Sequence, residues 1–261
     1  MYLTHFLENE HMSSINVTND SFTCHQVDDM AVITMLEGAK LLSTTISGKE
    51  RVLDLLETIK DSGHIRGLVV LFSSNYKGND EYKEFLLETI RERNFPSEGR
   101  YTITYKSALT QFLEIINAYP MPIVCGLSGD IGPDSFALSL ALDIRIATHT
   151  TRFVNPNIQM GLPPSPPLAF YLAHGLGYTK AMELILTKPG FSSQETFDLG
   201  LISQVVKEEE LEDTCLDILR QLTGIPGQTI AETRRMLQPD IIEVKKFIDS
   251  SFERSPGFLR K

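Results

Sequence analysis

Apolar residues follow two different spacings along the chain, and each spacing predicts a different kind of element. Between residues 47 and 62 the apolar positions recur at intervals of three and four, which predicts an amphipathic helix. Residues 68–72 and 122–127 are instead short, continuous apolar runs with β-branched members, as buried strands are. Strands that alternate with helices in this way indicate an α/β protein.

The segments around these elements extend the same alternation. Two β-rich runs, at 21–25 and 30–35, are separated by polar turn residues and predict a hairpin. Residues 81–93 are charged and free of breakers, and 105–119 carry apolar residues on one helical face, so both predict helices. The residues at 94–100 contain Pro and Gly and predict a break between the two helices.

The stretch 122–164 organises the rest of the chain. After its strand come a turn at 129–134, an almost wholly apolar helix at 135–142 and a second strand at 143–147. A Gly-rich turn that leads into a helix presents backbone N–H groups at the positive end of the helix dipole. This turn is therefore a candidate site for an anion or for an oxyanion that develops during a reaction.

The end of the chain is predicted to be entirely helical. Beyond residue 206 the apolar spacing indicates three helices between 211 and 252, with no further strand. Before residue 19 the chain is polar and irregular. The resulting division is a flexible N-terminus at 1–18, a core at 19–206 and a C-terminal helical region at 207–261.

Composition excludes several classes of function. A net charge of −10 argues against nucleic-acid binding, which needs clustered Lys and Arg. Cys24, Cys125 and Cys215 are far apart, and the six histidines are scattered, so no metal site is expected. Cys125 lies in an apolar run and is expected to be buried and inert. With no apolar run of about 18 residues and no signal-peptide pattern, we expect a cytoplasmic protein without a membrane partner.

Several stretches of the chain resemble one known family. The pattern is a strand that ends in Gly, a Gly-rich turn, a small-residue helix, Asp-Ile-Arg-Ile-Ala at 143–147 and Phe153-x-x-Pro156. It continues through 175–187 and 199–206, and 66–71 resembles a first core strand. Together they are similar to the crotonase (enoyl-CoA hydratase/isomerase) superfamily over about residues 20 to 260. The resemblance implies an α/β fold with a ββα spiral core and a C-terminal helical trimerisation region. The expected assembly is a homotrimer or a dimer of trimers.

The resemblance also implies where a substrate binds. In this family two backbone N–H groups hold a thioester carbonyl and stabilise its enolate, and the matching positions are Lys77 and Asp134. An acyl-CoA or acyl-carrier-protein thioester is the implied partner, with no cofactor beyond its CoA or phosphopantetheine moiety. The residues matched to the binding of that moiety are Lys40, Gly78, Asn79, Asp80 and Gly132. From the residues alone, the turn also fits a plain helix start with Asp134 or Ser135 as N-cap. We expect the Asp134 side chain to cap the helix, because a carboxylate facing an enolate would oppose it.

The chain departs from the family at positions that carry its chemistry. Ala137 and Asn157 stand where hydratases place two glutamates, and neither side chain can exchange a proton near neutral pH. Ser165 stands where some isomerases and dehalogenases carry an aspartate, within a Pro-rich loop at 163–167 that is expected to be polyproline-like. No histidine is adjacent in sequence to activate Ser165, and His174 is interpreted as structural.

These departures set the functional hypotheses. Amide and hydroxyl groups suit a decarboxylase or isomerase that stabilises an enolate without a strong base, and the candidate pocket residues are Asn155, Asn157, Gln159 and Ser165. A non-catalytic protein that binds acyl-CoA or serves as a scaffold is one alternative. The other is an atypical hydratase that recruits a carboxylate from elsewhere, and its candidates are Asp80, Glu81 and Asp134.

Overall fold

The computed structural model describes most of the chain from residue 15 onward. The described residues are 15–19, 22–36, 46–73, 80, 82–84, 86–87 and 99–254. Most of the predicted flexible N-terminus lies outside them. Within these ranges, no helix combines the length and the apolar composition that crossing a membrane requires.

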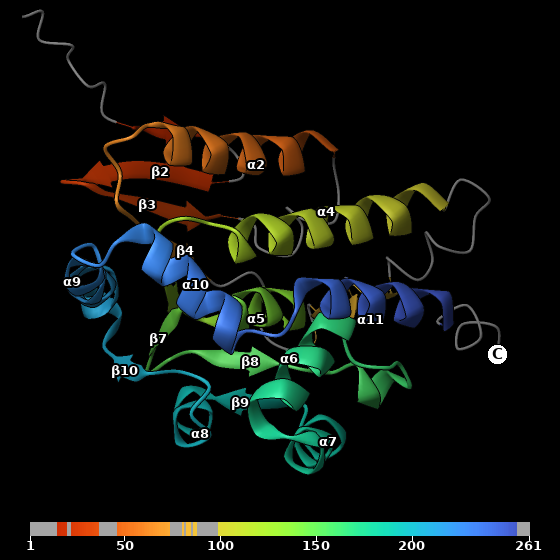
Figure 1. Cartoon of the computed structure of the whole chain (residues 1–261). Coiled ribbons are helices and arrows are strands. Elements are labelled where there is room, and N and C mark those ends of the chain that lie inside the picture. The colour runs from red at the N-terminus through yellow and green to blue at the C-terminus, as the bar shows by residue number, and fades with distance from the viewer. Residues whose placement is uncertain are drawn as a thin grey trace, which may run out of the picture.

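The fold is built on a twisted, largely parallel sheet (Figure 1). Within the described residues this main sheet has seven strands in the order β1-β2-β3-β4-β5-β7-β10. Its strands are β1 (Val17–Thr18), β2 (Phe22–Val27), β3 (Met30–Met35), β4 (Gly67–Phe72), β5 (Ile123–Leu127), β7 (Ile144–Thr148) and β10 (Gln204–Val206). β2 and β3 form the predicted hairpin, and the strands from β3 to β10 run parallel.

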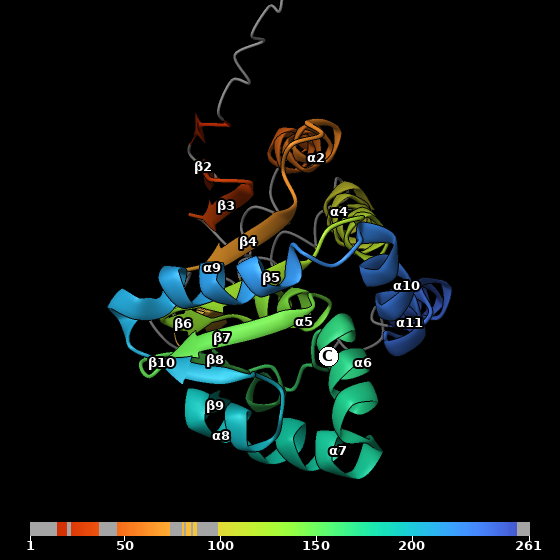
Figure 2. The same ribbon diagram turned by 60° about the vertical axis from the view of Figure 1, so that its left-hand side comes forward.

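Helices cover both faces of the main sheet (Figure 2). Because successive strand side chains point to opposite faces, β4 sends Leu68 and Val70 to one core and Val69 and Leu71 to another. The first core is closed by α2 (Ile46–Asp61) and α4 (Gly99–Asn117), and the second by α9 (Leu211–Leu222). This double covering explains why β4 and β5 are continuous apolar runs rather than alternating ones.

Two glycines allow α9 to lie close to the sheet. A Cβ atom added at Gly67 would stand 2.7 Å from Leu219 Cδ1, and one at Gly126 would stand 3.2 Å from the Cys215 sulfur. A larger residue at either strand position would therefore push the helix away from the sheet. The helix was predicted, but its close packing on the core was not.

A second, smaller sheet lies beside the main one. It consists of β6 (Asp130–Ile131), β8 (Arg152–Val154) and β9 (Gly190–Ser192). The sequence interpretation of 129–134 as a plain turn missed β6, because a strand of two residues leaves no periodic signal. The helices around it are α5 (Pro133–Leu140), α6 (Pro166–Leu176), α7 (Tyr178–Thr187) and α8 (Ser193–Asp198), with 3₁₀ turns at Ile158–Met160 and Glu208–Glu210.

Two predicted boundaries differ from the structure. The helix expected to begin at residue 105 already begins at Gly99. The predicted break at 94–100 is therefore wrong for residues 99 and 100, and its first five residues lie outside the described residues. The loop expected at 163–167 ends at Ser165, because Pro166 and Pro167 form the first turn of α6. Proline is compatible with a first helical turn, where its missing N–H has no helical partner to lose.

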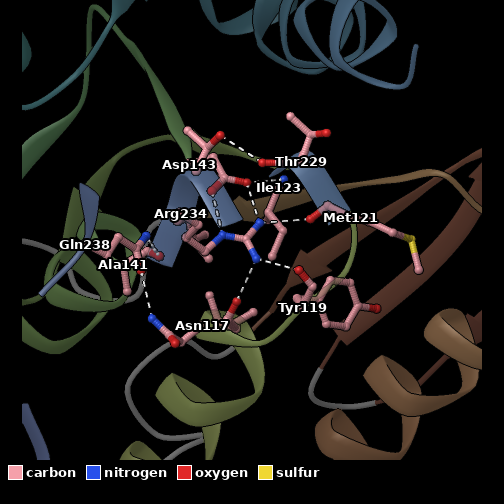
Figure 3. A network of polar contacts seen from close by, with 12 residues as sticks. Asn117, Tyr119, Met121, Ile123, Ala141, Asp143, Thr229, Arg234 and Gln238 are labelled. Atoms are coloured by element: carbon pink, nitrogen blue, oxygen red, sulfur yellow. Dashed lines mark hydrogen bonds and ion pairs between the residues drawn. The ribbon is translucent and has the colours of Figure 1, made fainter. Parts of the chain in front are cut away.

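The C-terminal region is helical, as predicted, and it is fastened to the core by one buried side chain. α10 (Gly227–Leu237) and α11 (Ile241–Arg254) follow α9. Figure 3 shows Arg234 of α10 between Asp143 and the chain that links α4 to β5. Its Nε and Nη2 atoms both donate to Asp143 at 2.7 Å, and its Nη1 and Nη2 atoms donate to the carbonyls of Ile116, Tyr119 and Met121.

This network joins four parts of the chain that are distant in sequence. Asp143 stands just before β7 and also accepts from the Ile123 N–H of β5 at 2.8 Å. Arg234 is 4% exposed, so its charge is stabilised almost entirely by this carboxylate and by the three carbonyls. Removing the guanidinium would leave a carboxylate that is 19% exposed and three carbonyls short of donors.

We predict that Arg234→Ala lowers the free energy of unfolding by about 3–5 kcal/mol, the cost of breaking a buried, hydrogen-bonded ion pair. Arg235→Ala is the matched control, because Arg235 pairs with Glu232 at 2.6 Å on the exposed face of the same helix. The control is expected to change stability by no more than about 0.5 kcal/mol. Urea denaturation measures both variants, and equal losses would contradict the assigned role.

The three cysteines are core residues. Cys24 and Cys125 belong to the first core and Cys215 to the second, and all are buried and unpaired. Burial raises the pKa of Cys24 to about 11 and that of Cys215 to about 12, and it raises the pKa of Cys125 well above its ordinary value. Because the thiolate is the reactive form, these side chains are poor nucleophiles.

We predict that the native protein resists alkylation by iodoacetamide at pH 8, whereas the unfolded chain takes up three carbamidomethyl groups. Intact-mass spectrometry with and without guanidinium measures both states. Rapid labelling of Cys125 in the native protein would show that this strand opens or that its thiol is not buried.

Candidate active site

The candidate site lies at the edge of the main sheet where β4 and β5 end. These strands pair in parallel from Leu68 with Ile123 to Phe72 with Leu127, so both end at the same edge. The Ser128 N–H donates to the Phe72 carbonyl at 3.0 Å, which carries the pairing one step further. In open α/β sheets this carboxyl edge is where ligands bind.

The first predicted oxyanion loop follows β4. Lys77, Gly78, Asn79 and also Lys40 lie outside the described residues, so the donor assigned to Lys77 stays a prediction. Asp80 is described, and its carboxylate is 93% exposed and pairs with the Lys83 ammonium at 3.1 Å. An exposed, paired carboxylate of this kind is typical of a surface helix.

The helical segment that contains Tyr82 is placed against β8. The Tyr82 side chain is 2% exposed and packs on Val154, with Leu86 beside them. This contact places Tyr82 beside the strand that precedes Asn155.

The second predicted oxyanion position stands in the first turn of α5. Gly132 is the N-cap, Pro133 is the first helical residue, and the first helical bond runs from the Phe136 N–H to the Gly132 carbonyl at 2.9 Å. The prediction that Asp134 or Ser135 is the N-cap is therefore wrong. The Asp134 N–H belongs to the first turn, at the positive end of the helix dipole. The donor role of Asp134 stays a prediction.

Aromatic packing fixes the direction of α5. The rings of Phe136 and Phe153 lie 4.1 Å apart between centroids, which holds the helix on β8. Ala137, on the next position of α5, is completely buried and has no polar atom. The position matched to one hydratase glutamate is therefore part of the apolar core.

Two buried asparagines follow β8. Asn157 donates from Nδ2 to the Pro163 carbonyl at 3.1 Å, whereas its Oδ1 has no hydrogen-bond partner among the described residues. Neither Oδ1 nor Nδ2 of Asn155 has a partner within the same ranges, although this side chain is 1% exposed. Buried polar atoms without partners are rare in native structures and cost free energy, so they often mark a functional site or an ordered water.

Ser165 and Asp134 form a direct pair. Ser165 immediately precedes α6, and its hydroxyl donates to Asp134 Oδ1 at 2.5 Å. Both side chains are more than nine-tenths buried. The bond is short because the acceptor is a carboxylate. The expectation that Asp134 caps α5 is thus replaced by a contact between the first turns of α5 and α6, which pack together (Figures 1 and 2).

No described histidine activates Ser165. His25 bonds to Glu212 at 3.0 Å, and His64 faces the Ser62 carbonyl and Gln26. His174 is exposed in the last turn of α6 rather than packed as a structural residue, and His149 is also exposed.

Of the predicted pocket residues, Gln159 is exposed on the 3₁₀ turn and so stands apart from the buried asparagines. Among the described residues, no three His, Cys, Asp or Glu side chains gather as metal ligands would.

Asp130 is the second carboxylate of this region, and sequence reasoning did not single it out. It is 6% exposed and accepts from the Nε and Nη2 atoms of Arg152 at 2.8 and 2.9 Å. The pair ties β6 to β8 just before the turn into α5. Arg152 is exposed, and the pair holds β6 beside β8.

Comparisons with known proteins agree on the family. Residues 88–244 match the family model of enoyl-CoA hydratase/isomerase. A methylmalonyl-CoA decarboxylase from Escherichia coli is 25% identical over 240 residues, covering 90% of this chain and 86% of that protein. The rat enoyl-CoA hydratase domain-containing protein 3, mitochondrial, is 30% identical over 136 residues, covering 52% of this chain and 45% of that protein.

Solved structures show the same fold. An enoyl-CoA hydratase from Bacillus halodurans superposes with a TM-score of 0.75 at 20% identity, covering 92% of this chain and 95% of its own. A methylmalonyl-CoA decarboxylase in complex with 2-nitronate-propionyl-CoA superposes with a TM-score of 0.69 at 23% identity, covering 93% and 90%. The predicted crotonase-like α/β fold is confirmed. The chain belongs to the enoyl-CoA hydratase/isomerase family.

Proposed function

We propose that the protein acts on an acyl thioester by stabilising an enolate, and that it decarboxylates a thioester whose acyl group carries a second carboxylate, as a malonyl group does. The Asp134 N–H at the start of α5 is one donor to the thioester oxygen, and the loop at 77–79 supplies the other. Such donors stabilise charge that appears only in the transition state.

One observation carries this choice of reaction: the carboxylates and polar groups around the start of α5 suit enolate stabilisation and not water activation. Ala137 is apolar and buried, and Asn157 is an amide. Among the described residues of this region, both carboxylates are already engaged, Asp130 by Arg152 and Asp134 by Ser165. Hydration needs a group that takes a proton from water, whereas loss of CO₂ does not.

The proposed reaction balances without a further reagent. The bond between the substrate's carboxylate and its neighbouring carbon breaks, CO₂ leaves, and the electron pair passes into the thioester as an enolate. A proton from water then adds to that carbon. No cofactor is needed beyond the CoA or phosphopantetheine moiety, which keeps the thioester bound.

One similarity supports this proposal: a relative that matches 90% of this chain is named a methylmalonyl-CoA decarboxylase. The solved structures include a hydratase and a decarboxylase of the same fold, so the choice of reaction rests on the residues of the site. A carrier-protein thioester would fit the same chemistry, because it presents the same phosphopantetheine arm.

The test of the proposed function is turnover of a pooled panel of malonyl-, methylmalonyl-, glutaconyl- and crotonyl-CoA, followed by mass spectrometry. We expect loss of 44 mass units, one CO₂, from at least one carboxylated member, and no gain of water by crotonyl-CoA. Gain of water by crotonyl-CoA would favour the atypical hydratase. No change in any member, with CoA binding intact, would favour a carrier-protein substrate or the non-catalytic alternative.

We also propose the homotrimer or dimer of trimers that the family resemblance implies. Large apolar side chains of α10 and α11 are exposed in the single chain, with Met236 at 82%, Leu237 at 73% and Ile242 at 55%. Exposed apolar side chains of this size favour an interface in an assembly.

The assembly is tested by light scattering on the eluted protein. We expect a mass about three or six times the 29.3 kDa of one chain. Leu237→Asp is expected to shift the mass toward the single chain, because it places a charge within the apolar surface. A wild-type mass of one chain would contradict the proposed assembly.

A further inference from the structure

Asp134 presents two groups with opposite effects on an enolate. Its backbone N–H stands in the first turn of α5 and would stabilise the charge, whereas its carboxylate is itself negative. The two groups are separated by only a few bonds, so the direction of the side chain decides which of them the substrate meets. This argument rests on the proposed function, which makes Asp134 a donor.

One contact fixes the Asp134 side chain from outside its own helix. The Ser165 hydroxyl donates to Asp134 Oδ1 at 2.5 Å, across 31 residues of sequence. The hydroxyl does not cap α6, because Ser165 makes no side-chain cap bond to this helix. The first helical bond of α6 runs instead from the Ala169 N–H to the Ser165 carbonyl, at 3.0 Å. The hydroxyl is therefore used for Asp134 and not for the helix that it precedes.

Ser165 is itself held in place from both sides. Pro166 and Pro167 follow it and restrict the backbone at the start of α6. On the other side, Asn157 binds the Pro163 carbonyl at 3.1 Å and so fastens the loop that leads to Ser165. A donor on a restrained backbone can impose a direction on the carboxylate that it binds.

We propose that Ser165 is a positioning residue that holds the Asp134 carboxylate away from the thioester oxygen, so that only the N–H of Asp134 faces the enolate. Without the hydroxyl, the carboxylate can turn toward the site where negative charge develops. The neutral thioester is little affected by that change and the transition state is strongly affected, so the loss falls on kcat rather than on KM.

The experiment compares four variants on the thioester that the panel identifies. Ser165→Ala is expected to lower kcat about 30-fold while KM changes by less than about threefold. Asp134→Asn keeps the N–H and removes the charge, and its own kcat is the reference for the double variant. Adding Ser165→Ala to Asp134→Asn is expected to change that kcat by less than about threefold. Ser165→Thr, which keeps the hydroxyl, is expected to recover most of the kcat that Ser165→Ala loses.

Ser139→Ala is the matched control. Ser139, five residues beyond Asp134, is a fully buried serine of α5 whose hydroxyl donates to the Phe136 carbonyl at 2.7 Å. Its loss reports the general cost of removing a buried hydroxyl from this region, and any fall in its kcat is not expected to be rescued by Asp134→Asn. If Ser165 had only a structural role, the kcat lost in Ser165→Ala would likewise not be restored by adding Asp134→Asn, and that result would overturn the proposal.

The double variant keeps the test decisive if Ser165→Ala alone does not fold. Once the charge at 134 is gone, the proposal requires that Ser165 be dispensable for kcat, so a double variant well below Asp134→Asn overturns it.

Binding of 2-nitronate-propionyl-CoA, an anionic mimic of an enolate, separates this proposal from the proposed function. We expect weaker binding by Ser165→Ala and recovery in the double variant. If binding falls and recovers in this way but no panel member is turned over, the role of Ser165 is supported and the decarboxylase assignment is wrong. If a panel member is turned over but binding and kcat are equal in all variants, the decarboxylase assignment is supported and the role of Ser165 is wrong. A wild-type protein that neither binds nor reacts would remove both.

Discussion

The parallel pairing of β4 with β5 is the constraint on which the rest of the structure depends. Both strands are buried on both faces, so their apolar side chains fix the register from Leu68 with Ile123 to Phe72 with Leu127. A shift by one residue would exchange the side chains that face the two cores. Because the register is fixed, the loops that follow Phe72 and Leu127 begin at the same edge, which is where the candidate site lies.

Packing on each face of the sheet then decides what stands at that edge. Gly126 lets α9 lie close on one face, and the contact of Phe136 with Phe153 directs α5 on the other side. Arg234 fastens the C-terminal helices to the start of β5 and β7, so the helical tail and the core strands support one another (Figure 3). The turn into α5 is thus held from several directions before any ligand binds.

Family membership and chemistry are decided by different residues. The family is set by the sheet, its turns and the helices that cover it, and relatives with that fold carry names as different as methylmalonyl-CoA decarboxylase and enoyl-CoA hydratase. In the proposed function the reaction depends on a few side chains around α5. These are an alanine, two buried amides with atoms that have no partner among the described residues, and a carboxylate that accepts from a serine.

The sequence by itself determined the elements and the family. The runs at β4 and β5, the helical spacing of α2 and the helical tail are local patterns, because burial of one face imposes a period on the chain. The same patterns identified the turn before α5. They missed β6, which is too short to show a period, and the start of α4.

Only the tertiary structure decided which polar groups meet. Asp134 and Ser165 are 31 residues apart, and Arg234 and Asp143 are 91 apart, so no spacing rule connects them. The sequence interpretation assigned the Asp134 side chain to helix capping, because a carboxylate that faced an enolate would oppose its charge. The structure gives it a partner from another helix instead, since a buried carboxylate takes the best-placed donor in space and not the nearest one along the chain.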